Sequence, residues 1–308
     1  MPKKQPLNPA DYIEPLYMNG LHGRMLRLKP SPRKTKEILV VYGQHASLER
    51  MFGIAESLNK YGGVTIPDLP GFGGMQSYYR LKEKPTIDNL ADYLASFVKL
   101  RYKNRRLTII GVSYGFAVVT RMLQKNPEIA KKVDLLVSAV GFVHHDDFVF
   151  KKPNYLVLRY GSGLFSRRLT AAVAKHLFLR PSFIRAVYKS SGTSNPKLNT
   201  NNPDERDQRI AFEIHLWRTN DLRTYMYSTS TMLRIDLCGK QVDLPVHHIA
   251  MQNDRYFNNE FVEEHLKVIY NEVTVYVSKS PAHVPTLTTV NDASKLIPPA
   301  LRRLLAKA

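Results

Sequence analysis

The alternation of apolar strands with amphipathic helices constrains the fold of this chain more than any other feature. Four runs between residues 37 and 142 are apolar and rich in β-branched side chains, as is typical of strands buried on both faces of a sheet. Segments with helical spacing separate them, which predicts parallel βαβ units and an α/β fold. The expected strands lie within residues 11–29 (two short strands), 37–43, 64–74, 106–112 and 132–142, and the expected helices lie within 46–63, 86–103 and 117–127.

The strand–helix pattern lapses after residue 142 and resumes near residue 245. The intervening chain is helix-like, polar and rich in loops. Further elements are expected at 245–254 (strand), 258–270 (helix), 271–280 (strand) and 290–307 (helix). We therefore expect a mostly parallel, doubly wound α/β core built from residues 1–141 and 236–308. A basic, mainly helical cap of residues 142–235 would be inserted after the sixth strand.

The composition excludes several classes of protein. No apolar run approaches the roughly 20 residues that span a bilayer, and the basic N-terminus lacks the apolar segment of a secretory signal. Cys238 is the single cysteine, which excludes an intramolecular disulfide and a cysteine-based metal site. We expect a cytoplasmic protein that needs no cofactor and no metal ion.

The strongest chemical motif is a G-x-S-x-G pattern centred on Ser113, between Gly111 and Gly115. The pattern is short, but here it follows an expected buried strand and precedes an expected helix. This is the context of a nucleophile elbow, in which a serine occupies a sharp, strained turn. The N-terminus of the following helix would also favour a developing negative charge. A phosphate-binding loop is disfavoured because its glycine and lysine signatures are absent at this position.

A serine nucleophile needs a base, and the base needs an acid that orients it. In this architecture the acid follows the serine along the chain and the histidine comes last. His283 lies in a loop after the last expected strand, and Asp254 comes at the end of the strand before it. Both lie at carboxyl ends of parallel strands, the edge where Ser113 also lies. Asp254 is favoured as the acid, and Asp146 and Asp147 are the alternatives.

Two backbone N–H groups are expected to stabilise the oxyanion of an acyl-transfer reaction. One belongs to Tyr114, the residue after the nucleophile. The other should come from the loop after the strand at 37–43, where Gln44 is the favoured donor and His45 the runner-up. The His45 side chain is interpreted as a helix-start group that faces solvent, with a place in the substrate pocket as the alternative.

With these residues the chain resembles the α/β-hydrolases, in particular lid-bearing serine esterases and lipases. The resemblance covers about residues 11–141 and 236–307. The matching segments are GVSYGF (111–116), YGQ (42–44), DLPGFGGM (68–75), MQND (251–254) and AHVP (282–285). It implies that Ser113 attacks an acyl carbonyl, that His283 transfers the protons and that Asp254 orients the imidazole.

Two residues depart from the family pattern. Tyr42 stands where the family usually has a histidine before Gly43, and Phe116 stands where it often has a further glycine. Phe116 is expected to narrow the substrate pocket from behind. The sole tryptophan, Trp217, lies in a segment expected to run as a helix toward the core. It is interpreted as packing within the cap, with the acyl pocket as the alternative.

The expected cap contains a strongly basic, aromatic-rich segment. Between residues 151 and 203 there are ten Lys and Arg residues and no Asp or Glu, in a chain whose net charge is +19. One interpretation places the interleaved apolar side chains in the acyl pocket and the charges on a solvated outer face. The others are contact with an anionic lipid or membrane surface and binding of an anionic substrate. Nucleic acid is disfavoured because no nucleic-acid motif is present.

The sequence therefore favours a serine hydrolase that cleaves a carboxylic ester or thioester of a small-molecule acyl substrate through an acyl-enzyme. C–C bond hydrolysis, amide hydrolysis and acyl transfer are the alternatives that use the same triad. A non-catalytic protein that binds a membrane or an anion through the basic cap is the alternative outside catalysis. Contact through the cap would make the protein peripheral at the inner membrane surface.

Overall fold

The computed structural model describes residues 7–32, 34–190, 200, 202–278, 293 and 296–307. One eight-stranded sheet with the order β1-β2-β4-β3-β5-β6-β7-β8 forms its centre. β1, β2 and β4 pair antiparallel, and β3 to β8 pair in parallel with their neighbours. The strands are β1 (Ile13–Met18), β2 (Leu21–Leu28), β3 (Glu37–Val41), β4 (Gly63–Pro67), β5 (Leu107–Val112), β6 (Val133–Ala139), β7 (Val242–Met251) and β8 (Tyr270–Ser278).

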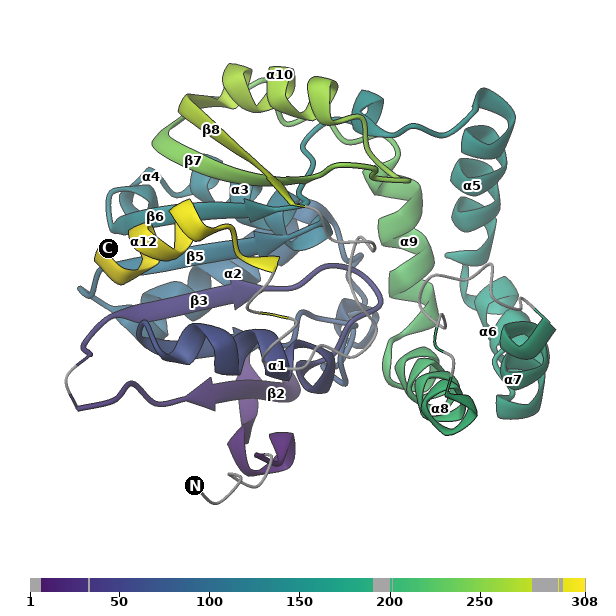
Figure 1. The fold of residues 1–308 in the computed structure, drawn as a ribbon. Helices are drawn as coiled ribbons and strands as arrows, with labels where there is room; N and C mark the ends of the chain where they lie inside the picture. Colours follow the sequence, from purple (N-terminus) through teal and green to yellow (C-terminus); the bar gives the residue numbers. More distant parts are fainter. Residues whose placement is uncertain are drawn as a thin grey trace.

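Helices cover both faces of this sheet. Figure 1 shows α1 and α12 in front of the sheet and α2, α3 and α4 behind it. Every residue of β3, β4 and β5 is buried, as their apolar sequences require. The core helices are α1 (Leu48–Asn59), α2 (Ile87–Tyr102), α3 (Tyr114–Lys125), α4 (Pro127–Ala130), α10 (Asn259–Ile269) and α12 (Pro299–Lys307), and the short 3-10 helices are η1 (Pro9–Tyr12), η2 (Tyr78–Leu81) and η3 (His145–Asp147). The predicted α/β fold with a mostly parallel, doubly wound sheet is confirmed.

Within the described residues, five α-helices, which we call the inserted helices, lie between β6 and β7. They are α5 (Lys152–Phe165), α6 (Arg168–Phe178), α7 (Pro181–Ser190), α8 (Pro203–Thr219) and α9 (Leu222–Met232). Figure 1 shows them beside the edge of the sheet toward which the parallel strands point. Ile184, Ile210 and Ile214 form a small hydrophobic cluster of their own, separate from the main core. Among the described residues, no helix is both long enough and apolar enough to cross a membrane.

Candidate active site

Ser113 occupies the sharp turn between β5 and α3, at the carboxyl edge of the sheet. Its backbone angles are φ 51° and ψ −124°, and a positive φ is strained for a residue other than glycine. The Ser113 N–H donates to the Ala139 carbonyl at 2.9 Å, and the Ser113 carbonyl accepts from the Phe116 N–H at 2.9 Å. These bonds hold the turn between β6 and α3. The arrangement is the strand–turn–helix context that a nucleophile elbow requires.

The two glycines that flank Ser113 lie where no side chain would fit. A Cβ on Gly111 would lie 2.6 Å from the Cα of Phe116. A Cβ on Gly115 would lie 2.5 Å from the carbonyl oxygen of Tyr42. The spacing of the motif therefore allows β5, α3 and the chain after β3 to approach one another at this turn.

The loop after β3 lies directly against the same turn. A Cβ on Gly43 would lie 3.1 Å from Ser113 Cβ and 3.3 Å from the backbone nitrogen of Tyr114. On its other side the loop is held by α9, because Gln44 Nε2 donates to Ser228 Oγ and lies 3.4 Å from Thr229 Oγ1. Gln44, the predicted second oxyanion donor, is thus fixed between the turn at Ser113 and the inserted helices.

A cavity of about 430 Å³ opens at Ser113, within the size range of small-molecule sites. Ser113, Tyr114 and Gln44 line it on the core side, and Leu158 of α5 lines it from the inserted helices. Exposed Arg255 also contributes to the lining. Most of the lining side chains are apolar, so the cavity suits an acyl group better than a polar one.

Aromatic side chains form one wall of this cavity. Phe142 stacks on Phe257 with the ring centroids 4.9 Å apart, and the ring of Phe148 lies 5.0 Å from both. All three rings line the cavity. Sequence reasoning missed this wall because Phe257 lies far along the chain from the other two. The phenylalanines that follow β6 are the sequence signal that could have indicated this wall.

Asp254, the favoured acid, lies in the turn that follows β7. Its Oδ1 accepts from the Tyr256 N–H at 2.8 Å and from the Phe257 N–H at 3.3 Å. The carboxylate is therefore fixed at the start of the segment that supplies the aromatic wall. β8 ends at Ser278, which is paired with Met251 at the end of β7. His283 lies outside the described residues, so the triad itself stays a prediction.

Asp147, one of the alternative acids, has other partners. Its buried carboxylate accepts from the N–H groups of Val143 and His144 at 2.9 Å through Oδ2. Its Oδ1 lies 2.6 Å from Nδ1 of His265 on α10. These bonds tie η3 to α10, and neither Asp147 nor Asp146 lines the cavity. Asp254 does not line the cavity either, so the assignment of the acid to Asp254 stays a prediction.

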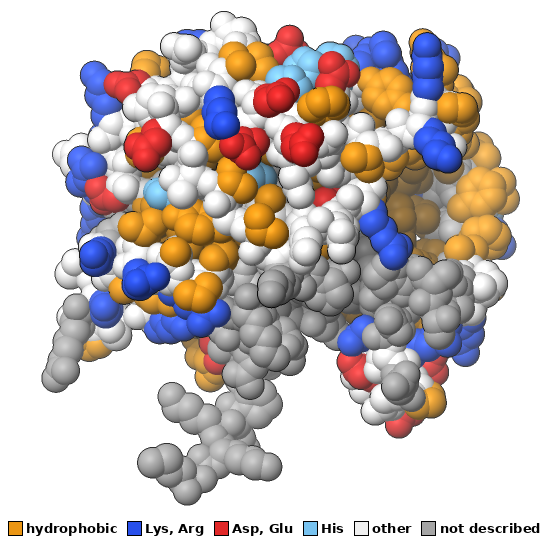
Figure 2. Space-filling model, turned by 45° about the horizontal axis from the view of Figure 1, so that its top comes forward, with side chains coloured by type: hydrophobic (Ala, Val, Ile, Leu, Met, Phe, Trp, Pro, Cys, Tyr) orange, Lys and Arg blue, Asp and Glu red, His pale blue; other side chains and the backbone are white. Residues whose placement is uncertain are grey.

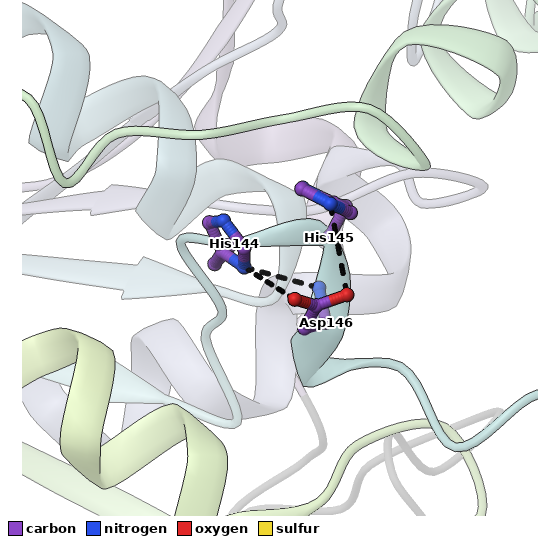
Figure 3. Close-up of side chains that lie close together, drawn as sticks. All are labelled: His144, His145 and Asp146. Carbon is purple, nitrogen blue, oxygen red and sulfur yellow. Dashed lines mark hydrogen bonds and ion pairs between the residues drawn. The ribbon is translucent and has the colours of Figure 1, made fainter.

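Asp146, the other alternative, lies beside two histidines of η3 and its N-cap. Figure 3 shows the trio, in which the carboxylate lies 3.7 Å from His144 Nδ1 and 3.6 Å from His145 Nε2. The pKa of His144 is lowered mainly by burial and to a smaller extent by the imidazoles of His145 and His265. A lowered pKa favours the neutral imidazole, which is the form that binds metal ions. Ligand atoms of the trio lie within 4.8 Å of one another, so these residues could hold a transition-metal ion such as zinc. None of the three lines the cavity at Ser113.

The interpretation of His45 as a solvent-facing side chain is wrong. His45 is 7% exposed, and its Nε2 lies 2.9 Å from Oε2 of Glu213 on α8. The Tyr188 hydroxyl donates to the same oxygen at 3.1 Å, and Arg50 Nη2 lies 3.6 Å from Glu213 Oε1. A fully buried carboxylate needs such polar partners, and it draws His45 inward. His45 also lines the cavity, as in the alternative interpretation.

Phe116 and Trp217 are not among the residues that line the cavity. Phe116 is fully buried, with its ring centroid 6.0 Å from that of Tyr270, and it is not among the residues that line the cavity. The expectation that it narrows the pocket is therefore wrong, because the ring packs into the core below β5. Trp217 packs among the inserted helices, where its Nε1 donates to the Tyr188 hydroxyl at 3.4 Å. Its ring centroid lies 4.4 Å from that of His45.

Tyr42, which departs from the family pattern, is anchored below the loop that carries Gln44. Its hydroxyl donates to Asp68 Oδ1, while Arg24 Nε donates to Asp68 Oδ2 at 3.1 Å. Burial raises the pKa of Asp68 to about 8, against the opposing effect of the Arg24 guanidinium. The segment after β4 is thereby joined to the chain after β3.

Comparisons with known proteins identify the same fold. The family model described as alpha/beta hydrolase fold matches residues 38–298. A solved membrane phospholipase A, described as a bacterial virulence factor, is 14% identical with a TM-score of 0.66 and covers 96% of this chain and 87% of its own. An esterase from Thermogutta terrifontis is 16% identical, with a TM-score of 0.60 over 96% of this chain and 97% of its own.

A third similar structure is an epoxide hydrolase, which is 14% identical with a TM-score of 0.60 and covers 96% of this chain and 95% of its own. No curated protein matches the sequence. At these identities the solved structures share the fold, and they differ in the bonds that their names say they act on. The substrate class of this chain must therefore be argued from its own residues.

Proposed function

Because the chain belongs to the α/β-hydrolase fold family, we propose that it is a serine hydrolase that cleaves a carboxylic ester or thioester. The observation that carries the proposal is the strained Ser113 at the wall of a largely apolar cavity. A strained serine after a buried strand and before a helix is typical of a nucleophile. An apolar cavity of this size suits an acyl chain rather than a charged head.

The proposed reaction begins with attack of Ser113 Oγ on the acyl carbonyl carbon, while His283 takes the Oγ proton. The backbone N–H groups of Tyr114 and Gln44 stabilise the oxyanion that forms on the carbonyl oxygen. The carbon–oxygen or carbon–sulfur bond to the leaving group then breaks, and His283 gives its proton to that group. A water molecule, deprotonated by His283, cleaves the acyl-serine and restores the hydroxyl of Ser113. Asp254 orients the imidazole throughout.

The serine at position 113 also argues against two other reactions of this fold. Epoxide hydrolysis and dehalogenation on the fold resemble ester hydrolysis but use an aspartate nucleophile. Asp254 and Asp147 both follow other strands, and neither stands at the turn after β5. The proposal therefore assigns acyl transfer to water as the reaction class.

A substrate panel tests the proposal. We expect hydrolysis of p-nitrophenyl esters of short and medium acyl chains, with a burst of p-nitrophenol equal to the enzyme concentration if deacylation is slow. Ser113→Ala and His283→Ala should each lower kcat by roughly 10³-fold or more. Activity confined to β-diketones or to aminoacyl amides would overturn the ester assignment, and full activity of Ser113→Ala would overturn the nucleophile.

A further inference from the structure

Helices α5, α6 and α7 turn apolar stripes outward into solvent. On α6 the stripe consists of Leu169, Val173 and Leu177, which are 79%, 57% and 49% exposed and lie at the i, i+4, i+8 spacing of one helix face. The inward face of α6 carries only the small buried residues Ala171 and Ala174. This is the reverse of an ordinary surface helix, which turns its apolar stripe toward the core.

The two neighbouring helices repeat the pattern. On α5 the outward stripe consists of Val157, Tyr160 and Leu164, and on α7 it continues with Phe183 and Val187. Eleven of the twenty exposed large hydrophobic side chains in the described chain belong to these three helices. Exposed apolar side chains that gather in this way mark an interaction surface rather than chance exposure. We call the solvent-exposed side of α5, α6 and α7, with the loops that join these helices, the outer face of the inserted helices.

The charges of the outer face have a single sign. Residues 151 to 190 contain nine Lys and Arg residues and no Asp or Glu. Eight of the nine are exposed, and within the described part of the chain Lys189 alone has an acidic partner within 4.0 Å, Asp207 of α8. Figure 2 shows Lys and Arg side chains beside hydrophobic ones around a hollow at the right of the molecule. Cationic side chains around apolar stripes complement an anionic surface with an apolar interior.

We propose that the outer face of the inserted helices docks on an anionic lipid bilayer. A second copy of the chain fits this face poorly, because an isologous contact would bring nine positive charges against nine others. A nucleic acid would match the charge, but it would leave the apolar stripes without a partner. A bilayer matches both, because its anionic headgroups meet the Lys and Arg side chains while its acyl region receives the stripes.

The proposed docking also bears on the source of substrate. α5 carries Val157 on its outward stripe and Leu158 in the cavity wall, so one helix borders both the proposed bilayer contact and the cavity. An ester dissolved in the bilayer would reach the cavity along α5. This part rests on the proposed function, whereas the docking itself does not.

Vesicle binding tests the docking separately from catalysis. Full-length Ser113→Ala protein, which cannot consume lipid, is mixed with phosphatidylcholine vesicles that contain or lack phosphatidylglycerol, and bound protein is measured by co-sedimentation. We expect binding to the phosphatidylglycerol vesicles that weakens as salt is raised, because surface charges are screened. In parallel, the esterase activity of the wild type is measured on a soluble ester. A failure of vesicle binding can then be distinguished from a failure of the proposed esterase activity.

Three sets of exposed substitutions locate the contact. The charge set is Arg167→Gln, Arg168→Gln and Lys175→Gln, the apolar set is Leu169→Ser, Val173→Ser and Leu177→Ser, and the control set on the core is Lys29→Gln, Lys84→Gln and Arg101→Gln. The charge set should weaken binding by roughly a hundredfold, from about fivefold per lost charge, and the apolar set by at least roughly tenfold. The control set should change it little. All three sets replace exposed side chains, so each should keep the wild-type melting temperature.

Four outcomes of the binding measurements would overturn the proposal. They are equal binding to vesicles with and without phosphatidylglycerol, no binding at low salt, binding that the charge and apolar sets leave unchanged, and tighter binding to duplex DNA than to the vesicles. A dimer in sedimentation velocity that the apolar set alone dissociates would also overturn it, because the stripes would then contact a second copy.

Discussion

Ser113 combines a strained backbone with a place in a cavity wall, and these two properties depend on residues around it that serve packing. Gly111 and Gly115 leave no room for a Cβ, and Ala139 holds the turn from β6. Strain of this kind persists only where the surroundings over-determine it. At the residue scale the site is therefore a rigid turn with a polar group at its tip.

The acid of the triad can be identified by a matched pair of substitutions. Asp254→Asn keeps an oxygen that can accept from Tyr256 and Phe257, so the fold should persist while kcat falls by up to roughly 10⁴-fold. Asp147→Asn should leave kcat near the wild-type value and lower the free energy of unfolding by about 1–3 kcal/mol, because its buried bonds to Val143, His144 and His265 are weakened. Steady-state kinetics and urea denaturation measure the two effects. The opposite pattern would make Asp147 the acid.

His248 should give the stability of the protein a dependence on pH. Burial lowers the pKa of its imidazole from 6.5 to about 4, while Nδ1 lies 2.9 Å from Ser138 Oγ. The unfolded chain therefore binds a proton that the folded protein rejects between about pH 4 and pH 6.5. This stability is fully present above pH 6.5 and is lost as the pH falls, by roughly 3 kcal/mol over the window.

Urea denaturation across this pH range measures the effect. His248→Asn should be less stable at neutral pH, because the smaller side chain packs less well, but its free energy of unfolding should fall less steeply with decreasing pH. An unchanged slope in the variant would show that other groups cause the pH dependence.

At the scale of elements, the inserted helices contact the loop after β3 at two neighbouring residues. α8 reaches His45 through Glu213, and α9 reaches Gln44 through Ser228 and Thr229. The predicted oxyanion donor is the backbone N–H of Gln44, one of the two attached residues. The inserted helices therefore act on the loop after β3 as well as on the cavity.

Removal of one attachment tests this support. Gln44→Ala keeps the backbone N–H of the predicted donor but loses the bonds to α9, and we expect kcat to fall on the order of tenfold with little change in KM. Thr231→Ala is the control, because among the described residues the Thr231 hydroxyl bonds to the carbonyls of Tyr227 and Ser228 on its own helix and to no group of the loop after β3. Equal kinetics for Gln44→Ala and the control would mean that α9 does not position the loop.

Local patterns explain which elements could be predicted. The buried strands β3 and β5 are apolar runs, and such a pattern is visible within six residues. The partners of His45 were not predictable, because Glu213 lies 168 positions away and no local pattern joins them. The prediction for Phe116 was wrong for a related reason. Its place in the family motif suggested that the ring narrows the pocket, whereas long-range packing places the ring in the core.

At the scale of the whole molecule, two unlike surfaces meet at the cavity. The core supplies Ser113 and a fixed loop, and the inserted helices supply an apolar, cationic outer face. The sequence indicated the charge of this face, and one of its interpretations assigned the apolar side chains to the pocket, whereas another assigned the segment to a lipid surface. All three of Leu158, Leu164 and Leu177 are exposed, and of these Leu158 alone lines the cavity. The direction of a stripe depends on how the helices pack, and spacing alone does not set it.

The nucleophilic serine is the central claim, and labelling with a fluorophosphonate probe tests it most directly. We expect one adduct per wild-type chain, mapped by mass spectrometry of peptides to Ser113, and no adduct on Ser113→Ala. His283→Ala should fold normally and label far more slowly, because the base that activates the hydroxyl is lost. No labelling of the wild type, or equal labelling of wild type and Ser113→Ala, would contradict the assignment.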